Sequence, residues 1–250
     1  MSSKKESEKK KCWGDSSFHD DPKMILKRLK DGNKRFVTNN LERPNQSTQR
    51  RACTANNGQR PYVIVLSCAD SRVPPELIFD TGIADIFVVR VAGNIANTSS
   101  IASIEFAVAV LGCQFILVLG HEGCGAVATA IKGGEAPSES LRHLLEEIKP
   151  AVKKCKCGNG IDEKKKKKKW KTLKDECKNE ALSAEDTNAG CLTKVTIENA
   201  HHAAKQLVKK SNILKEAAAS TDIAKKLTIH TGFYHLASGK VDFDIKSGCN

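Results

Sequence analysis

The chain has 250 residues, 40% of them hydrophobic, which is enough for a substantial core but does not decide between one domain and two. Its net charge of +12 is confined to two segments, because residues 1–14 carry +3, residues 149–178 carry +9, and the remainder is neutral. A neutral body argues against sequence-specific nucleic-acid binding, and the longest apolar runs, such as Phe115–Leu119, are far too short for a membrane-spanning helix.

The ends of the chain and its charged segments carry little sign of regular structure. Residues 1–20 are predicted to form a disordered tail, and the lack of an apolar stretch there argues against a secretory signal, so the cytoplasm is the predicted location. Residues 155–190 are interpreted as a solvated, lysine-rich insertion into a single domain that spans residues 21–250. The ten cysteines are interpreted mainly as free thiols and metal ligands rather than as a disulfide framework.

Regular elements are predicted in chain order from the spacing of apolar residues. Asp21 and Pro22 suit a helix start, and the helix is expected to run to about Asp31, followed by an extended arm at residues 39–60. Beyond residue 61, short continuous apolar runs, typical of buried strands, alternate with helical periods. The strands are predicted at residues 62–66, 85–91 and 115–119, and the helices at residues 99–111, 126–132, 141–154 and 193–210.

This alternation predicts an α/β fold with a central, mainly parallel β-sheet flanked by helices. An N-terminal helical arm precedes the sheet. Residues 227–236 and 241–245, on either side of a Ser-Gly turn, predict a β-hairpin at the C-terminal end. The helix at residues 141–154 is expected to be regular only up to a kink at Pro150.

Two polar motifs follow two of the predicted strands. Cys68 follows the first strand, with Asp70 and Arg72 just beyond it, and His121 and Cys124 follow the third strand as His-x-x-Cys. In open α/β sheets, ligands bind at the carboxyl ends of parallel strands, where residues distant in sequence become neighbours. Two thiolates and an imidazole are good tetrahedral zinc ligands and leave a fourth position open. The motifs therefore predict a zinc site formed by Cys68, His121 and Cys124.

Each part of this pattern also has a purely structural interpretation. A buried cysteine usually acts as a small hydrophobic residue, a single His-x-x-Cys is a weak motif, and an Asp-x-Arg pair is more often a surface ion pair of small value. What favours a metal site is their combination at the ends of two strands.

The residues around these motifs resemble a known family. Cys-Ala-Asp-Ser-Arg-Val-Pro-Pro-Glu at residues 68–76, together with Gly-His-Glu-Gly-Cys-Gly at residues 120–125, is similar to the paired signature of the β-carbonic anhydrases. The resemblance covers about residues 22–153 and 191–245. Further similar stretches are residues 29–36, 89–94 and 103–108, and the hairpin between residues 232 and 243.

The resemblance implies a zinc enzyme with one Zn²⁺ per subunit that converts carbon dioxide reversibly to bicarbonate and a proton by attack of zinc-bound hydroxide. Cys68, His121 and Cys124 would be the metal ligands. Asp70 would either take the fourth metal position or be held away from it by an ion pair with Arg72. Arginine suits that role because its planar guanidinium binds a carboxylate through two hydrogen bonds.

The resemblance also implies contacts beyond the metal ligands. Gln59, Val73 and Gly125 match residues that line the small substrate pocket, and Gln59 would reach it from a partner subunit in a homodimer or homotetramer. Two alternatives remain open. The same site could hydrolyse CS2 or COS, or the zinc could be structural in a protein that binds polyanions through the lysine run.

A second metal site is less favoured. Four cysteines lie in or beside the lysine-rich segment but lack the paired Cys-x-x-Cys spacing of strong zinc motifs. We interpret them as solvated thiols: Cys155, Cys157, Cys177 and Cys191.

Overall fold

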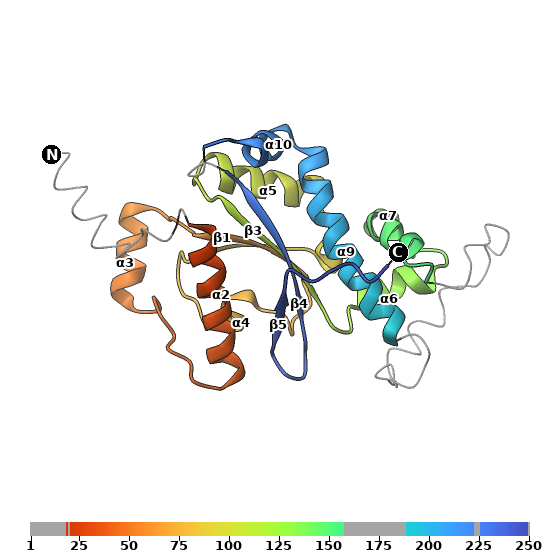
Figure 1. The fold of residues 1–250 in the computed structure, drawn as a ribbon, viewed down its shortest axis with the longest axis horizontal. Coiled ribbons are helices and arrows are strands. Elements are labelled where there is room, and N and C mark those ends of the chain that lie inside the picture. The colour runs from red at the N-terminus through yellow and green to blue at the C-terminus, as the bar shows by residue number, and fades with distance from the viewer. Residues whose placement is uncertain (1–18, 20, 158–188, 223–225, 250) are drawn as a thin grey trace.

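A computed structural model describes residues 19, 21–157, 189–222 and 226–249. The predicted disordered tail, apart from residue 19, and most of the lysine-rich insertion lie outside these residues. The described residues form one five-stranded sheet with helices around it (Figure 1), and the strand order is β2-β1-β3-β4-β5.

The sheet is parallel except at its last strand, which confirms the predicted fold class and the C-terminal hairpin. The central strands β1 and β3 pair in parallel, β2 flanks β1, and β4 flanks β3. β5 runs antiparallel to β4. The strands are β1 (Val63–Ser67), β2 (Ile86–Arg90), β3 (Phe115–His121), β4 (Thr228–Tyr234) and β5 (Val241–Phe243).

After β1, the helices agree with the predicted periods within a few residues. Three short helical elements there, α4, η2 and α10, were not predicted. None of the described helices combines the length and the apolar character that crossing a bilayer requires. The helical elements are α2 (Pro22–Val37), α3 (Thr48–Asn57), α4 (Pro75–Ile78), η2 (Ala92–Asn94), α5 (Thr98–Ala109), α6 (Gly125–Lys132), α7 (Glu139–Lys154), α9 (Ala189–Lys210) and α10 (Asn212–Ala219).

Both faces of the sheet are covered. Ile64 and Leu66 of β1 point to one side, where they join buried residues of α5, α9 and α10. Val63 and Val65 point to the other side, towards α2 and α4. Burial on both faces explains why the strands have continuous apolar sequences instead of alternating ones.

Three helical predictions were wrong in detail. α2 continues past Asp31 because tertiary contacts hold its second half: the amide of Asn33 donates to the carbonyl oxygens of Ile78 and Gly239 and is buried. The predicted extended arm contains α3. α7 passes through Pro150 to Lys154, and the buried residues on either side of the proline keep this turn packed on the body.

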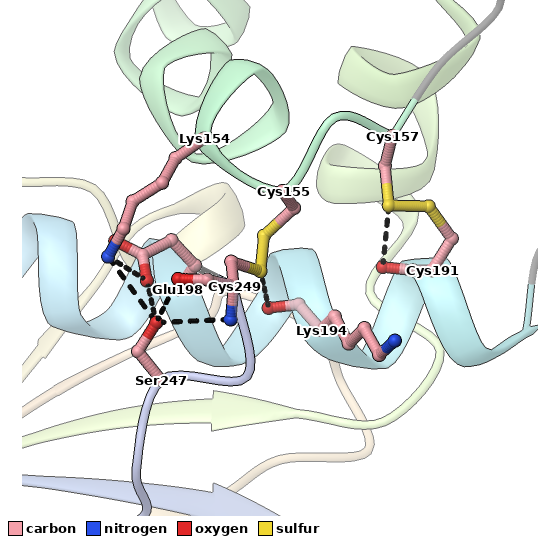
Figure 2. The surroundings of a disulfide bond; sticks show 8 residues. All are labelled: Lys154, Cys155, Cys157, Cys191, Lys194, Glu198, Ser247 and Cys249. Carbon is pink, nitrogen blue, oxygen red and sulfur yellow. Dashed lines mark hydrogen bonds and ion pairs between the residues drawn. A yellow bond between two sulfur atoms is a disulfide. The ribbon is translucent and has the colours of Figure 1, made fainter.

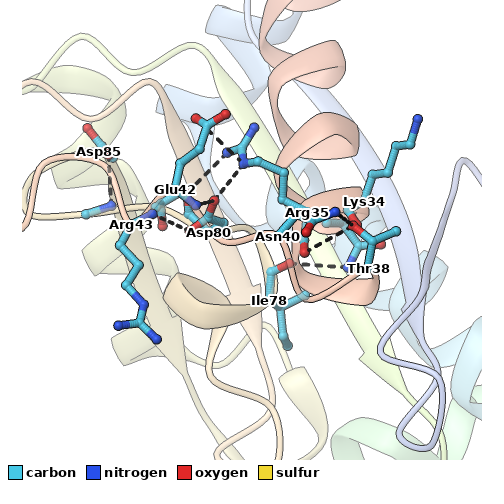
Figure 3. Close-up of polar contacts among 12 residues, drawn as sticks. Lys34, Arg35, Thr38, Asn40, Glu42, Arg43, Ile78, Asp80 and Asp85 are labelled. Atoms are coloured by element: carbon cyan, nitrogen blue, oxygen red, sulfur yellow. Dashed lines mark hydrogen bonds and ion pairs between the residues drawn. The ribbon is translucent and has the colours of Figure 1, made fainter.

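The loop between α2 and α3 is attached to the body by a buried carboxylate. Asp80 accepts hydrogen bonds from Nε of Arg35 at 2.6 Å and from the backbone N–H groups of Glu42 and Arg43, each at 3.0 Å (Figure 3). Burial opposes ionisation of Asp80, but Arg35 and the two N–H donors outweigh it, so the pKa of this carboxyl lies below its ordinary value. The end of α2 and the loop that follows it are thus fixed to the segment after α4.

Candidate metal centre

The adjacent strands β1 and β3 bring three metal-binding side chains together. Cys68 directly follows β1, His121 is the last residue of β3, and Cys124 occupies the N-cap position of α6. The ligand atoms of these three residues, hereafter the triad, all lie within 4.8 Å of one another, and all three residues are buried. The carboxyl ends of parallel strands thus converge as the sequence predicts.

The imidazole of His121 is oriented for metal binding. Its Nδ1 lies 2.8 Å from the carbonyl oxygen of Glu122. A carbonyl can only accept, so Nδ1 donates this hydrogen bond and Nε2 carries a lone pair. Among the described residues, Nε2 has no hydrogen-bond partner although it is buried. A bound metal ion would satisfy this atom, and such a hydrogen bond on the other ring nitrogen is typical of histidine ligands.

The two sulfurs favour a cation between them. The backbone N–H groups of Asp70 and Gly93 donate to Sγ of Cys68 at 3.4 and 3.3 Å. The hydrogen bond from Cys124 lowers the pKa of Cys68 to about 4 against the effect of burial, and the Cys68 thiolate in turn raises the pKa of Cys124. The low pKa of Cys68 favours a thiolate at this sulfur, and thiolate is the form that binds a divalent cation. The donor set, two thiols and a neutral imidazole, fits Zn²⁺.

Asp70 borders the triad and is held by Arg72. Nε and Nη2 of Arg72 donate to Oδ1 and Oδ2 at 2.9 and 2.7 Å, and its backbone N–H donates to Oδ1 at 2.9 Å. This two-pronged contact is the main reason why the pKa of Asp70 falls to about 2. Oδ2 lies 4.0 Å from Nε2 of His121, so the carboxylate stands beside the triad with its oxygens turned to the guanidinium.

Three residues that the sequence analysis did not place at the site support it. Nε of Arg90 donates to the carbonyl oxygen of Cys68 at 2.9 Å, and its Nη2 donates to that of Asp70 at 2.5 Å. Asn199 of α9 donates to the carbonyl oxygen of Gly93 at 2.7 Å, and the N–H of Gly93 is one of the donors to Cys68. Arg90 and Gly93 lie in a stretch that resembles the family, whereas nothing in the sequence marks Asn199.

Comparison with known proteins agrees with the geometry. The family model described as carbonic anhydrase matches residues 63–241, most of the chain, and this range contains the whole triad. The chain belongs to the β-carbonic anhydrase family.

Two curated carbonic anhydrases are clearly related to this family member. This chain is 45% identical over 134 residues to carbonic anhydrase 2 of Mycobacterium tuberculosis. It is 44% identical over 134 residues to the carbonic anhydrase of Mycolicibacterium smegmatis. Each alignment covers 52% of the chain and, respectively, 64% and 65% of the relative. The chain thus spans less than two thirds of the curated relatives that it matches.

A solved carbonic anhydrase has the same fold. One of the tetrameric β-carbonic anhydrases of the ascomycete Sordaria macrospora superposes with a TM-score of 0.58 at 22% identity, covering 81% of this chain and 88% of that one. At this identity the likeness supports the architecture alone.

The three predicted pocket residues differ in their exposure. Val73 is fully buried, in the core face that also holds the strands β1 and β3. Gly125 is exposed at the start of α6, next to Cys124. Gln59 is exposed after α3, and no hydrogen bond joins it to the triad within the described part of this single chain.

The interpretation of the peripheral cysteines as solvated thiols was wrong. Cys155 is bonded to Cys249 and Cys157 to Cys191 (Figure 2). Folding brings the start of α9 and the C-terminal segment beside the end of α7, which the spacing of the cysteines could not reveal. Cys177 lies outside the described residues. Among those described, the free cysteines are Cys68, Cys113 and Cys124, so two of the three belong to the triad.

Proposed function

We propose that this protein is a zinc-dependent carbonic anhydrase that reversibly hydrates carbon dioxide to bicarbonate and a proton. The observation that supports this most is the buried triad, in which Nε2 of His121 lies near two free sulfurs and has no hydrogen-bond partner among the described residues. Zinc bound there would act as a Lewis acid that makes water a nucleophile near neutral pH. Cys68, His121 and Cys124 would hold the ion, one per subunit.

Asp70 and Arg72 would be the catalytic pair. The guanidinium of Arg72 binds both carboxylate oxygens of Asp70, and while it holds them, a zinc ion bound by the triad would keep its fourth position open. Each carboxylate oxygen can accept more than one hydrogen bond. The ionised Asp70 could therefore accept a hydrogen bond from a water or hydroxide at the triad, and this bond would orient the oxygen towards carbon dioxide.

The pocket would be small and completed by a second subunit. Val73 would form its apolar wall, and Gly125 would leave space beside Cys124 because no side chain projects there. The exposed Gln59 would complete it from the partner in a homodimer or homotetramer. We further propose that residues 21–250 act as a single domain and that the protein works in the cytoplasm.

Metal analysis combined with a stopped-flow assay of carbon dioxide hydration tests this function. The wild type should contain about one zinc per chain, as expected for a three-ligand site, and should hydrate carbon dioxide. Cys68→Ser should lose zinc and activity together, and Asp70→Asn should retain zinc but lose activity.

Cys113→Ser is the matched control, because it changes a buried free cysteine outside the triad. It should retain both zinc and activity. Negligible hydration by the zinc-loaded wild type would sink the proposal. Turnover of CS2 or COS in that same preparation would instead identify the related hydrolase, and binding of polyanions without any turnover would identify a structural zinc site.

A further inference from the structure

Two disulfides stand side by side at the end of α7. Cys155 and Cys157 are separated by one residue, and they bond to the C-terminal segment and to the start of α9, respectively (Figure 2). The bonded cysteines lie 94 and 34 positions apart in sequence. We call these two bonds the α7 clamp. The clamp joins three segments that meet only in the folded chain.

A buried charge depends on the position of the clamped segments. Glu198 of α9 is buried and accepts hydrogen bonds from Nζ of Lys154 at 2.8 Å and from the hydroxyl of Ser247. Lys154 precedes Cys155, and Ser247 lies two residues before Cys249 (Figure 2). The Cys155–Cys249 bond therefore holds both donors at the carboxylate. Without them, a buried carboxylate would be left unpaired, which is strongly unfavourable.

Helix α9 extends from the clamp to the metal centre. Cys191 lies in its first turn, and Asn199, eight residues later, is about 12 Å along the helix axis. Asn199 donates to the carbonyl oxygen of Gly93, and the N–H of Gly93 donates to Sγ of Cys68. A shift of α9 therefore changes a hydrogen bond of a triad sulfur.

The clamp and the triad also share one apolar cluster. Cys68 and Cys124 belong to it, together with Val152 of α7 and Val195 of α9, and the clamp residues Cys155 and Cys157 pack against its edge. Because protein interiors are close-packed, a displacement of α7 or α9 is transmitted through such a cluster.

We propose that the α7 clamp is a redox-sensitive site and that its reduction loosens the triad. Two thiols of the glutathione class would reduce each bond, so that two electrons pass to the protein disulfide, two protein thiols form and the reductant becomes a disulfide. The inference rests on the proposed function for the zinc ion and for the cytoplasm, where the few disulfides that form are usually transient and either catalytic or redox-sensing.

The test uses the full chain loaded with zinc and incubated in glutathione buffers from oxidising to strongly reducing. Alkylation followed by mass spectrometry reports which cysteines are free, and a chromophoric chelator reports the rate of zinc release. We expect the clamp cysteines to become alkylated in the buffers of a reducing cytoplasm. Zinc release should then be about tenfold faster or more, the effect typical of losing a residue that orients a metal ligand.

Variants separate the clamp from other effects of reduction. Cys155→Ala/Cys249→Ala and Cys157→Ala/Cys191→Ala lack one bond each, and the alanines cannot bind zinc as the freed thiols of a reduced clamp could. Both should release zinc faster than the wild type in oxidising buffer. Cys113→Ala is the control and should release zinc at the wild-type rate.

Two results would overturn the proposal. Bonds that stay intact in the most reducing buffer would be structural, and reduction without a change in zinc release would show that the clamp and the triad are independent. Amide hydrogen exchange at Gly93 adds a readout that needs no metal, and it should accelerate on reduction. An oxidised protein that fails to bind zinc or to hydrate carbon dioxide would count against the proposed function only, and unchanged exchange at Gly93 would then refute the clamp.

Discussion

Gly93 offers a quantitative test of how tightly the metal centre is packed. It lies in η2 with φ +71°, and a Cβ atom at this position would stand 2.7 Å from Cδ1 of Ile148 and 3.3 Å from Cβ of Ala126. Gly93→Ala therefore carries two penalties. The left-handed backbone costs a residue with a Cβ about 1–2 kcal/mol, and forcing a methyl group into a filled core costs about 1–3 kcal/mol. The expected loss of unfolding free energy is their sum, roughly 2–5 kcal/mol.

Gly112 provides the matched control. It has the same φ of +71°, but nothing lies within 4 Å of the Cβ that an alanine would add. Gly112→Ala should therefore cost only the backbone term, about 1–2 kcal/mol. Urea denaturation of the zinc-free proteins measures both losses without a contribution from the metal, and their difference isolates the steric term. Equal losses for the two variants would refute the packing argument.

A second substitution checks which atom is responsible. Ile148→Val removes Cδ1, the atom nearest to the added methyl group. Alone it should cost about 0.5–1.5 kcal/mol, but in the Gly93→Ala background it should cost less or be stabilising. A double-mutant cycle without coupling between the two positions would place the strain elsewhere.

Three further predictions concern polar side chains that bind backbone groups. The pKa of Asp80 is depressed in the folded protein, so the ionised carboxylate stabilises the fold above its unfolded pKa near 3.8. This contribution is lost as the pH falls through the lower folded pKa. The unfolding free energy should therefore decrease less on acidification for Asp80→Asn than for the wild type. Arg90→Ala should weaken zinc binding about 10- to 100-fold in chelator competition, because the backbone carbonyl oxygens of Cys68 and Asp70 lose the hydrogen bonds that Arg90 donates. A wild-type zinc affinity would contradict this role. Asn33→Ala leaves three buried backbone groups without their partner and should cost about 3 kcal/mol in urea denaturation, against less than about 0.5 for the exposed Asn40→Ala.

The sequence was most informative where one physical cause dominates. Buried parallel strands need continuous apolar runs, so the central strands were predicted within one or two residues of their bounds. Their parallel direction follows from the alternation of strands and helices. The convergence of Cys68, His121 and Cys124 could be predicted for the same reason, since strand ends share one edge of the sheet.

Tertiary contacts decide the features that the sequence did not reveal. α3 has a polar sequence without apolar periodicity, and its start depends on the Ser47 side chain, which accepts from the N–H of Arg50. Cys155 and Cys157 find partners only because α9 and the C-terminal segment pass the end of α7. Asn199 acts on the triad through the backbone of Gly93, and such a relay has no sequence pattern.

The neighbouring placement of β1 and β3 has a consequence for how the protein matures. Cys68 and His121 lie 53 positions apart, and they meet only after the crossover that contains β2 and α5 has folded and both strands have paired. Pairing over such a separation forms late, because the chain must first lose the entropy of closing the intervening loop. The nascent polypeptide therefore cannot bind the ion before β1 and β3 have paired. Uptake of the metal thus indicates that the centre of the sheet has formed.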